Sequence, residues 1–159
     1  MIKKKSAFTM IELVFVIVIL GILASVAIPR LAATRDDAEL TKAKTVVASV
    51  RNALAMERQK RILRGDFKKI TAVGGNLSGT DTYVFGNFFV GSPAVDTGVP
   101  VMEYPIISEA GKQNKWSYNS GNQQYIFKSI LGDTAFIVNS RGKFVCVDEN
   151  SDGCKTLTK

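Results

Sequence analysis

Few side chains in this sequence could do chemistry, and they fall into two groups. The chain has no histidine, so the commonest general base and the commonest metal ligand are both missing. Two cysteines, Cys146 and Cys154, bracket an acidic segment near the C-terminus, and one carboxylate, Glu12, lies inside a long apolar run. No phosphate-binding glycine loop and no evident pair of catalytic carboxylates accompanies them. The sequence therefore predicts a protein that is not an enzyme.

The two cysteines have two interpretations. In an exported chain, Cys146 and Cys154 would form one disulfide, worth roughly 2.5 kcal/mol by the chain-entropy estimate. In a reducing compartment they would stay free thiols. Their number and spacing exclude a CxxC redox centre and a cysteine-rich zinc site. The N-terminal segment predicts export, which favours the disulfide.

The segment between the cysteines contains Asp148, Asn150 and Asp152 followed by Gly153, which matches the first half of an EF-hand calcium loop. The second half does not match, because Lys159 stands where the loop requires a bidentate glutamate. Two interpretations stay open: an acidic polar turn, which we favour, and a partial calcium site completed by other residues. We expect no other cofactor.

Glu12 lies in the run from 8 to 28, FTMIELVFVIVILGILASVAI. As a helix this run would be roughly 30 Å long, the thickness of the bilayer hydrocarbon core. Three lysines directly before it, Lys3, Lys4 and Lys5, predict a cytoplasmic N-terminus and an exported C-terminal domain. A carboxylate near the centre of a membrane helix costs about 2.5–3.5 kcal/mol, and somewhat less near its end. Glu12 therefore needs a partner.

Three kinds of N-terminal segment fit this pattern. They are a signal peptide cut after Ala27, a signal-anchor helix and a prepilin leader. The first two give Glu12 no role, and a signal peptide needs no apolar run of this length. The prepilin leader is therefore the preferred interpretation.

Residues 3–13, KKKSAFTMIEL, resemble the class III signal of type IV pilins and pseudopilins. The resemblance implies cleavage between Ala7 and Phe8 by a membrane aspartyl prepilin peptidase, followed by N-methylation of Phe8. Family members usually carry glycine before the cut, and Ala7 is small enough to replace it. Pro29 stands where pilins usually have a helix-kinking proline. The resemblance covers about the first 30 residues, and disulfide-closed C-terminal loops like the one expected here are frequent in type IV pilins.

Such a protein would be a structural subunit of a type IV pilus, a secretion pseudopilus or a DNA-uptake pilus. Its partners would be copies of itself or other pilins, the prepilin peptidase, and an inner-membrane assembly platform with its ATPase. The new amine of Phe8 would pair with Glu12 of a neighbour in a low-dielectric surround, and Gly21 and Ser25 would allow close helix approach. The alternative is a minor pilin, a membrane-anchored module that binds DNA or a surface.

Localisation and charge follow from the same interpretation. The protein would sit in the inner membrane with an exported C-terminal domain before assembly, and in an extracellular or periplasmic filament afterwards. Loss of the three leader lysines would lower the formal charge from +7 to +4. This excess is mild, so a solvated surface is favoured over nucleic-acid binding.

The sequence predicts an α+β fold in which one long helix packs on a small antiparallel sheet. The leader is 1–7, the assembly half of the helix 8–29 and its amphipathic half 30–64. An i,i+4 pair of Glu57 with Arg61 and a Gly65 cap are expected at the helix end. The apolar stripe of the amphipathic half is made of Leu40, Ala43, Val47, Val50 and Leu54, widened by Val46 and Ala53.

The remainder divides into two regions. Residues 65–115 are expected to be an irregular connection with short strands or turns, pinned by Phe67, Tyr83, Phe85, Phe88 and Phe89. Residues 116–159 should form about four antiparallel strands and the C-terminal disulfide loop. The expected strands are 115–118, 124–130, 135–139 and 143–147, with turns at 120–122, 132–133 and 140–142.

Overall fold

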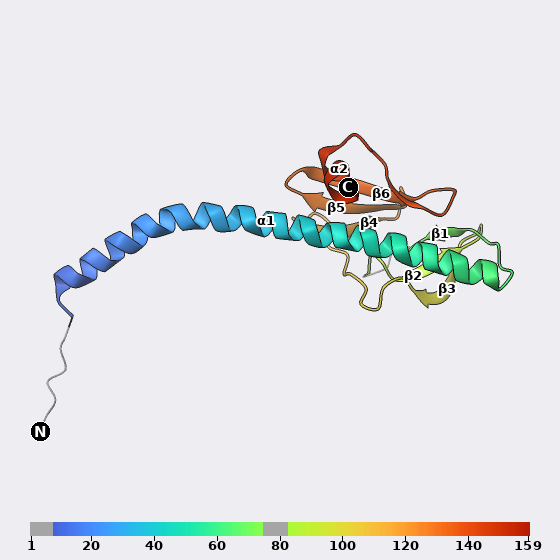
Figure 1. Cartoon of the computed structure of the whole chain (residues 1–159), viewed down its shortest axis with the longest axis horizontal. Coiled ribbons are helices and arrows are strands. Elements are labelled where there is room, and N and C mark those ends of the chain that lie inside the picture. Colours follow the sequence, from blue (N-terminus) through green and yellow to red (C-terminus); the bar gives the residue numbers. More distant parts are fainter. Residues whose placement is uncertain (1–7, 75–82) are drawn as a thin grey trace, which may run out of the picture. The chain divides into compact units, whose positions relative to one another are not determined.

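The computed structural model describes residues 8–74 and 83–159 (Figure 1). The chain forms two compact units, one ending at Asp37 and one running from Ala38 to Lys159. A single helix, α1 (Met10–Leu63), contributes to both. The second unit also contains two antiparallel sheets and a short C-terminal helix, and the fold is α+β as predicted.

Helix α1 ends at the predicted glycine cap. The Asp66 N–H donates to the Arg61 carbonyl at 2.9 Å, and the Gly65 N–H donates to the Ile62 carbonyl at 3.0 Å. This pair of bonds is the Schellman motif, which places the residue after the helix in the left-handed region. Gly65 has a φ of 74°, a conformation that glycine adopts without steric cost.

The predicted apolar stripe of α1 is buried in the second unit. Leu40, Ala43, Val47, Val50 and Leu54 are all part of its core. Their recurrence at spacings of three and four residues puts them on one face of the helix. The two residues expected to widen the stripe, Val46 and Ala53, are partly buried against the same core.

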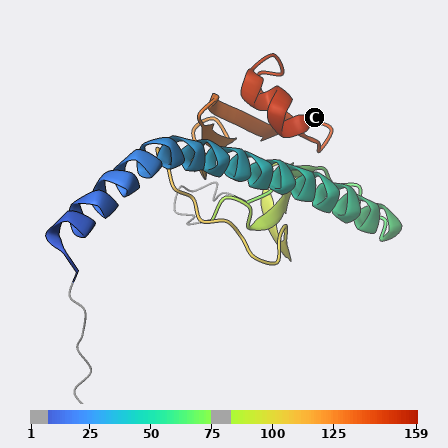
Figure 2. The same cartoon turned by 60° about the vertical axis from the view of Figure 1, so that its left-hand side comes forward.

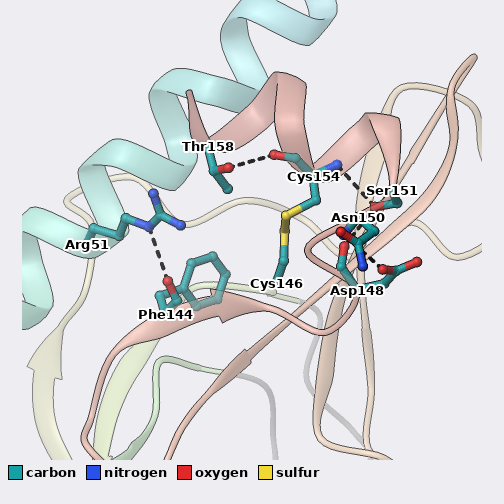
Figure 3. Close-up of a disulfide and its surroundings, with 8 residues drawn as sticks. All are labelled: Arg51, Phe144, Cys146, Asp148, Asn150, Ser151, Cys154 and Thr158. Carbon is teal, nitrogen blue, oxygen red and sulfur yellow. Dashed lines mark hydrogen bonds between the residues drawn. A yellow bond between two sulfur atoms is a disulfide. The ribbon is translucent and has the colours of Figure 1, made fainter.

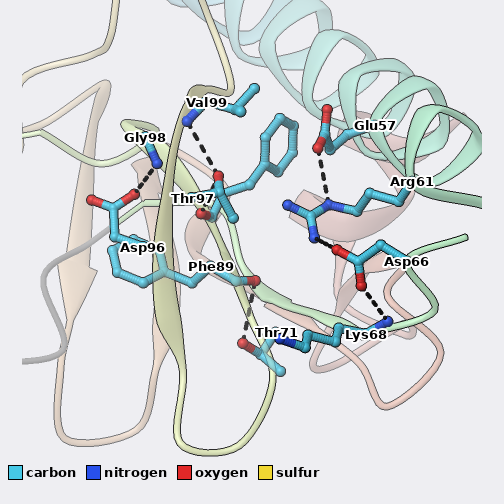
Figure 4. A network of polar contacts seen from close by, with 11 residues as sticks. Glu57, Arg61, Asp66, Lys68, Thr71, Phe89, Asp96, Thr97, Gly98 and Val99 are labelled. Carbon is cyan, nitrogen blue, oxygen red and sulfur yellow. Dashed lines mark hydrogen bonds and ion pairs between the residues drawn. The ribbon is translucent and has the colours of Figure 1, made fainter. Parts of the chain in front are cut away.

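A polar chain fixes the last turns of α1 to the segment that follows (Figure 4). Arg61 donates to Glu57 through Nε at 2.9 Å and to Asp66 through Nη1 at 2.8 Å. Asp66 in turn accepts from the backbone N–H of Lys68 at 3.0 Å. The side chains of Glu57 and Arg61 are only 6% and 11% exposed, so the predicted pair is present and largely desolvated.

The C-terminal sheet has the four antiparallel strands that the sequence predicts, in the order β4-β5-β6-β7. One expected turn was wrong. The β5–β6 turn lies at 130–131 rather than 132–133, because Gly132 already pairs with Ser129 as the first residue of β6. The strands are β4 (Lys115–Asn119), β5 (Gln124–Ser129), β6 (Gly132–Val138) and β7 (Phe144–Cys146).

The connecting region carries a second antiparallel sheet, in the order β1-β2-β3. Figure 2 shows its green and yellow strands beside the later part of α1. Its strands are β1 (Ile70–Ala72), β2 (Asn87–Val90) and β3 (Val95–Pro100). Phe85 and Phe88 are buried, as expected of residues that pin the connecting region. The same expectation was wrong for Phe67, which is 78% exposed, and for Tyr83, which is about half exposed. Phe89 is partly buried.

Aromatic rings from the two regions meet in the core. The ring centroid of Phe85 lies 5.2 Å from that of Trp116 and 5.4 Å from that of Tyr125. Phe136 stacks on Phe144 at 5.0 Å. Because Phe85 precedes β2 whereas Trp116 and Tyr125 belong to the four-stranded sheet, the two Phe85 contacts join the connecting region to the C-terminal strands.

Tyr125 also holds the chain just after β1. Its buried hydroxyl donates to the Gly74 carbonyl at 2.8 Å and accepts from the Val73 N–H at 3.0 Å. Burial raises the pKa of the Tyr125 phenol. Gly74 has a φ of 104°, and a Cβ there would lie 2.2 Å from the Gly86 nitrogen. A larger residue at Gly74 would therefore push this segment away from the backbone at Gly86.

We predict that Tyr125→Phe destabilises the second unit by about 1–3 kcal/mol, because the Val73 N–H and the Gly74 carbonyl both lose a buried partner. Urea unfolding of the detergent-solubilised protein, followed by near-UV circular dichroism, measures the change. Tyr104→Phe is the matched control, since Tyr104 is 80% exposed. Equal unfolding midpoints for the two variants would contradict the role given to the Tyr125 hydroxyl.

Candidate functional site

The first turn of α1 contains a reciprocal side-chain cap. Glu12 Oε2 accepts from the N–H of Thr9 at 3.3 Å and from its hydroxyl at 3.0 Å. The Glu12 N–H donates back to Thr9 Oγ1 at 3.3 Å. This is a capping box, in which a Ser or Thr before the helix and a Glu or Gln three residues later satisfy each other's backbone donors.

The capping box gives Glu12 a partner that the sequence analysis overlooked. The signal was present, because Thr9 and Glu12 have the required spacing directly before an apolar run. The Glu12 carboxylate therefore has hydrogen-bond partners in its own chain, and a partner in another subunit is not the only way to satisfy it. The bonds found for the Glu12 carboxylate both use Oε2 and come from neutral donors of Thr9, so its negative charge is not neutralised by the cap.

The residues around this cap and after it have exposed apolar side chains. Phe8 is 77% exposed, and the large apolar side chains from Met10 to Ile28 are exposed as well. Within the described residues, α1 is the one helix long and apolar enough to cross a membrane. An exposed apolar surface of this size is unfavourable in water, which favours its cover by lipid or by other helices.

Four other residues were predicted to act in the N-terminal segment. Ala7 and the rest of the leader lie outside the described residues. Pro29 lies within α1, which is continuous through it. Gly21 has open space where a Cβ would be, and the Ser25 hydroxyl donates to the Ile22 carbonyl of its own helix at 2.7 Å. The Ser25 hydroxyl is thus already satisfied, which leaves close approach as its contribution to packing.

At the other end of the chain, Cys146 and Cys154 form the predicted disulfide, with their Cα atoms 6.2 Å apart (Figure 3). The disulfide joins the end of β7 to a short helix, α2 (Asp152–Thr158), that was not predicted. Ser151 caps α2 by accepting from the Cys154 N–H at 3.3 Å. Gly153 packs so closely on β6 that a Cβ would lie 2.0 Å from Thr134 Oγ1.

The three residues of the EF-hand-like motif are engaged in local structure. Asp148 Oδ1 accepts from the Asn150 N–H at 3.0 Å. Asp152 lies in the first turn of α2, and its Oδ1 is 3.9 Å from the Lys155 ammonium. Over 8–74 and 83–159, no group of three or more His, Cys, Asp or Glu side chains could hold a metal ion. Calcium binding here stays an untested prediction.

Comparisons with known proteins bear on the N-terminal half. Residues 2–28 match the family model described as the prokaryotic N-terminal methylation motif. The chain is also 37% identical over 79 residues to the type IV narrow pilus major component PilA5 of Thermus thermophilus, a match that covers 48% of this chain and 68% of that protein. The chain belongs to the type IV pilin and pseudopilin family.

Other relatives of this pilin-family chain belong to secretion systems. It is 43% identical over 54 residues to type II secretion system core protein G of Vibrio cholerae and 40% identical over 53 residues to the same protein of Escherichia coli. These matches cover 34% and 33% of the pilin chain, and the chain spans 37% of the length of each relative. No solved structure matches the chain.

Family membership supports three general statements. The pilin is a structural protein rather than an enzyme. Family membership is compatible with more than one assembly, because the relatives include a pilus component and secretion-system core proteins. The prepilin signal and the apolar helix indicate a membrane-associated or secreted protein.

We predict that reducing the disulfide lowers the free energy of unfolding by roughly 2.5 kcal/mol, because the unfolded chain regains loop entropy. Calcium and EDTA should leave the melting temperature unchanged, since Lys159 replaces the strongest ligand of the motif. Thermal unfolding of the solubilised protein measures both effects, with Asp152→Ala as the control. A gain in stability with calcium that disappears in Asp152→Ala would instead establish a calcium site.

Proposed function

We propose that this chain is a structural subunit of a type IV pilus-like filament and that it polymerises through the N-terminal half of α1. The observation that carries the proposal is the exposed Glu12 carboxylate, which lies in the apolar part of α1 and within the matched methylation motif, residues 2–28. Pilus, secretion pseudopilus and DNA-uptake pilus are all compatible with the relatives.

The first supporting argument is electrostatic. Cleavage before Phe8 would leave an α-amine four residues from Glu12. Within one helix the Glu12 carboxylate already receives the Thr9 donors, and these are neutral groups. An ammonium from a neighbouring subunit would neutralise the remaining charge in a low-dielectric surround, where such pairing is strong. Each subunit would then be set in axial register by its neighbour.

The second argument concerns packing. The large apolar side chains from Phe8 to Ile28 are exposed within the described part of the chain, so they need a cover. Lipid covers them before assembly, and the same face can pack on neighbouring helices in a filament. Gly21 offers open space for close approach of another backbone. The transfer from lipid to filament would thus conserve apolar contacts and add the Glu12 ion pair.

The proposal implies specific partners. A prepilin peptidase would cut between Ala7 and Phe8 and methylate Phe8. An inner-membrane assembly platform with its ATPase would extract the subunit from the membrane, where the second unit is already exported. The filament would contain further copies of this chain or other pilins.

We predict that mature protein from membranes begins at N-methylated Phe8. Intact-mass and N-terminal peptide mass spectrometry measure this directly. An N-terminus at Ile28 would identify a secreted protein cut by signal peptidase and would end the filament proposal.

A second prediction separates the two roles of Glu12. Glu12→Gln keeps the capping box, because glutamine serves at this position, but it removes the charge. If the ion pair drives assembly, Glu12→Gln and Glu12→Ala should both insert into membranes and yield few sheared filaments when no wild-type protein is present. Thr9→Ala removes the cap, at a cost of about 1 kcal/mol, but keeps the charge. It should assemble far better than either Glu12 variant.

Filament yield is compared at equal membrane levels of each variant. Normal yield from Glu12→Gln together with loss in Thr9→Ala would assign Glu12 to capping alone and refute the inter-subunit pair. Abundance in the sheared fraction also separates a major subunit from a minor pilin acting at a tip.

A further inference from the structure

A basic groove lies in the second unit between the last part of α1 and β7. It has a volume of about 380 Å³, and its cationic side chains are Arg51, Arg58 and Lys143. Its apolar floor includes Leu54, Phe144 and Val145. The described residues that line it include no carboxylate, so any charged occupant should be an anion.

The two arginines of the basic groove are held in place by backbone carbonyls. Arg51 donates through Nε to the Phe144 carbonyl at 3.1 Å (Figure 3). Arg58 donates through Nη1 to the Arg141 carbonyl at 2.8 Å. Each bond uses one nitrogen of a guanidinium that has five N–H donors. The partners are neutral, so both charges are positioned without being neutralised.

The positive charge of the basic groove is not balanced elsewhere in the described part of the chain. Among those residues, no ion pair involves Arg51, Arg58 or Lys143. A neighbouring hollow shares Arg58 with the groove and adds Lys68, Lys69 and Arg141. The one acid that lines this hollow, Asp66, is already paired with Arg61.

The same unit carries a rigid acidic loop beyond the other end of β7. Asp148, Glu149 and Asp152 are exposed there. The loop is closed by the disulfide, by the Asp148–Asn150 turn and by the Ser151 cap of α2. Preorganised charges of this kind bind with little further loss of conformational entropy. Within the described residues, Asp152 is 3.9 Å from the Lys155 ammonium, and none of the three acids forms an ion pair with a cation of the basic groove.

We propose that the acidic loop of one subunit docks in the basic groove of a neighbouring copy. The proposal rests on the filament function proposed above. Two different, complementary surfaces on one molecule form a heterologous contact, which generates open helical filaments rather than closed dimers. The pairing of three carboxylates with three groove cations sets orientation and excludes wrong registers. Because assembly through α1 holds the second units close together, even a weak contact is populated at high effective concentration.

Charge reversal with rescue tests the contact in cells that lack the wild-type protein. Lys143 and Glu149 are suitable positions, because both are exposed. Lys143→Glu and Glu149→Lys should each lower sheared-filament yield about fivefold, the effect expected for an exposed ion pair worth about 1 kcal/mol. The double variant should recover most of the yield. Lys44→Glu, an exposed reversal on α1 outside the groove, should assemble normally.

Cross-linking tests the same contact in the native sequence. A carbodiimide joins a lysine amine directly to a carboxylate, so it should link Lys143 to Asp148, Glu149 or Asp152. Mixing isotope-labelled and unlabelled chains identifies links between copies by mass spectrometry. The link should appear in sheared filaments and, at high protein concentration, in detergent-solubilised protein.

Several outcomes would overturn the proposal. Normal filaments from both single variants would do so, as would a double variant no better than the singles or the absence of the cross-link. If Lys143→Glu assembles normally but loses binding of a fluorescent single-stranded oligonucleotide, the groove is a nucleic-acid site instead. Failure of the wild-type protein to form filaments would refute the filament function, and the cross-link in solubilised protein would then decide the groove–loop contact separately. Equal melting temperatures of all variants verify that each one folds.

Discussion

The apolar stripe of α1 that begins at Leu40 is buried against the aromatic core of the second unit, whereas the apolar side chains from Phe8 to Ile28 are exposed. One helix thus has a buried apolar stripe in its second half and exposed apolar side chains in its first half. The core of the second unit depends on the buried stripe, and the proposed assembly depends on the exposed side chains. The stripe supplies the helical half of the core on which both sheets are built. The apolar side chains from Phe8 to Ile28 are exposed among the described residues, and covering such a surface with lipid or with other helices is favourable.

Glu12 shows how one residue can meet two demands. Its carboxylate completes the capping box with Thr9, which stabilises the helix start, and it keeps a charge that hydrogen bonds from neutral donors do not cancel. A partner with a positive charge would be favoured most where water is excluded. The basic groove and the acidic loop extend the same principle to the second unit, where charges are positioned by backbone carbonyls and by a disulfide.

The sequence by itself determined the features that depend on local pattern. Leu40 to Leu54 recur at helical spacing, so the buried face of α1 could be predicted. Residues 115–147 consist of β-rich runs separated by short turn segments, and this pattern predicted four antiparallel strands. Gly65 followed a cationic last turn, which predicted the helix cap. The N-terminal signal and the close spacing of Cys146 and Cys154 predicted the family and the disulfide.

Tertiary structure decided what depends on contacts between distant segments. Strands β1–β3 lie in a region that glycines and prolines interrupt, so local pattern did not predict their pairing into one sheet. Contacts of Phe85 and Tyr125 join that region to the core. Helix α2 exists because the disulfide and Gly153 hold it against β6. The basic groove forms where α1 lies beside β7. The residues that meet there are separated by more than 80 positions in the sequence. No local sequence pattern predicts a contact between such distant segments, because it depends on loop closure and packing rather than on the preferences of neighbouring residues.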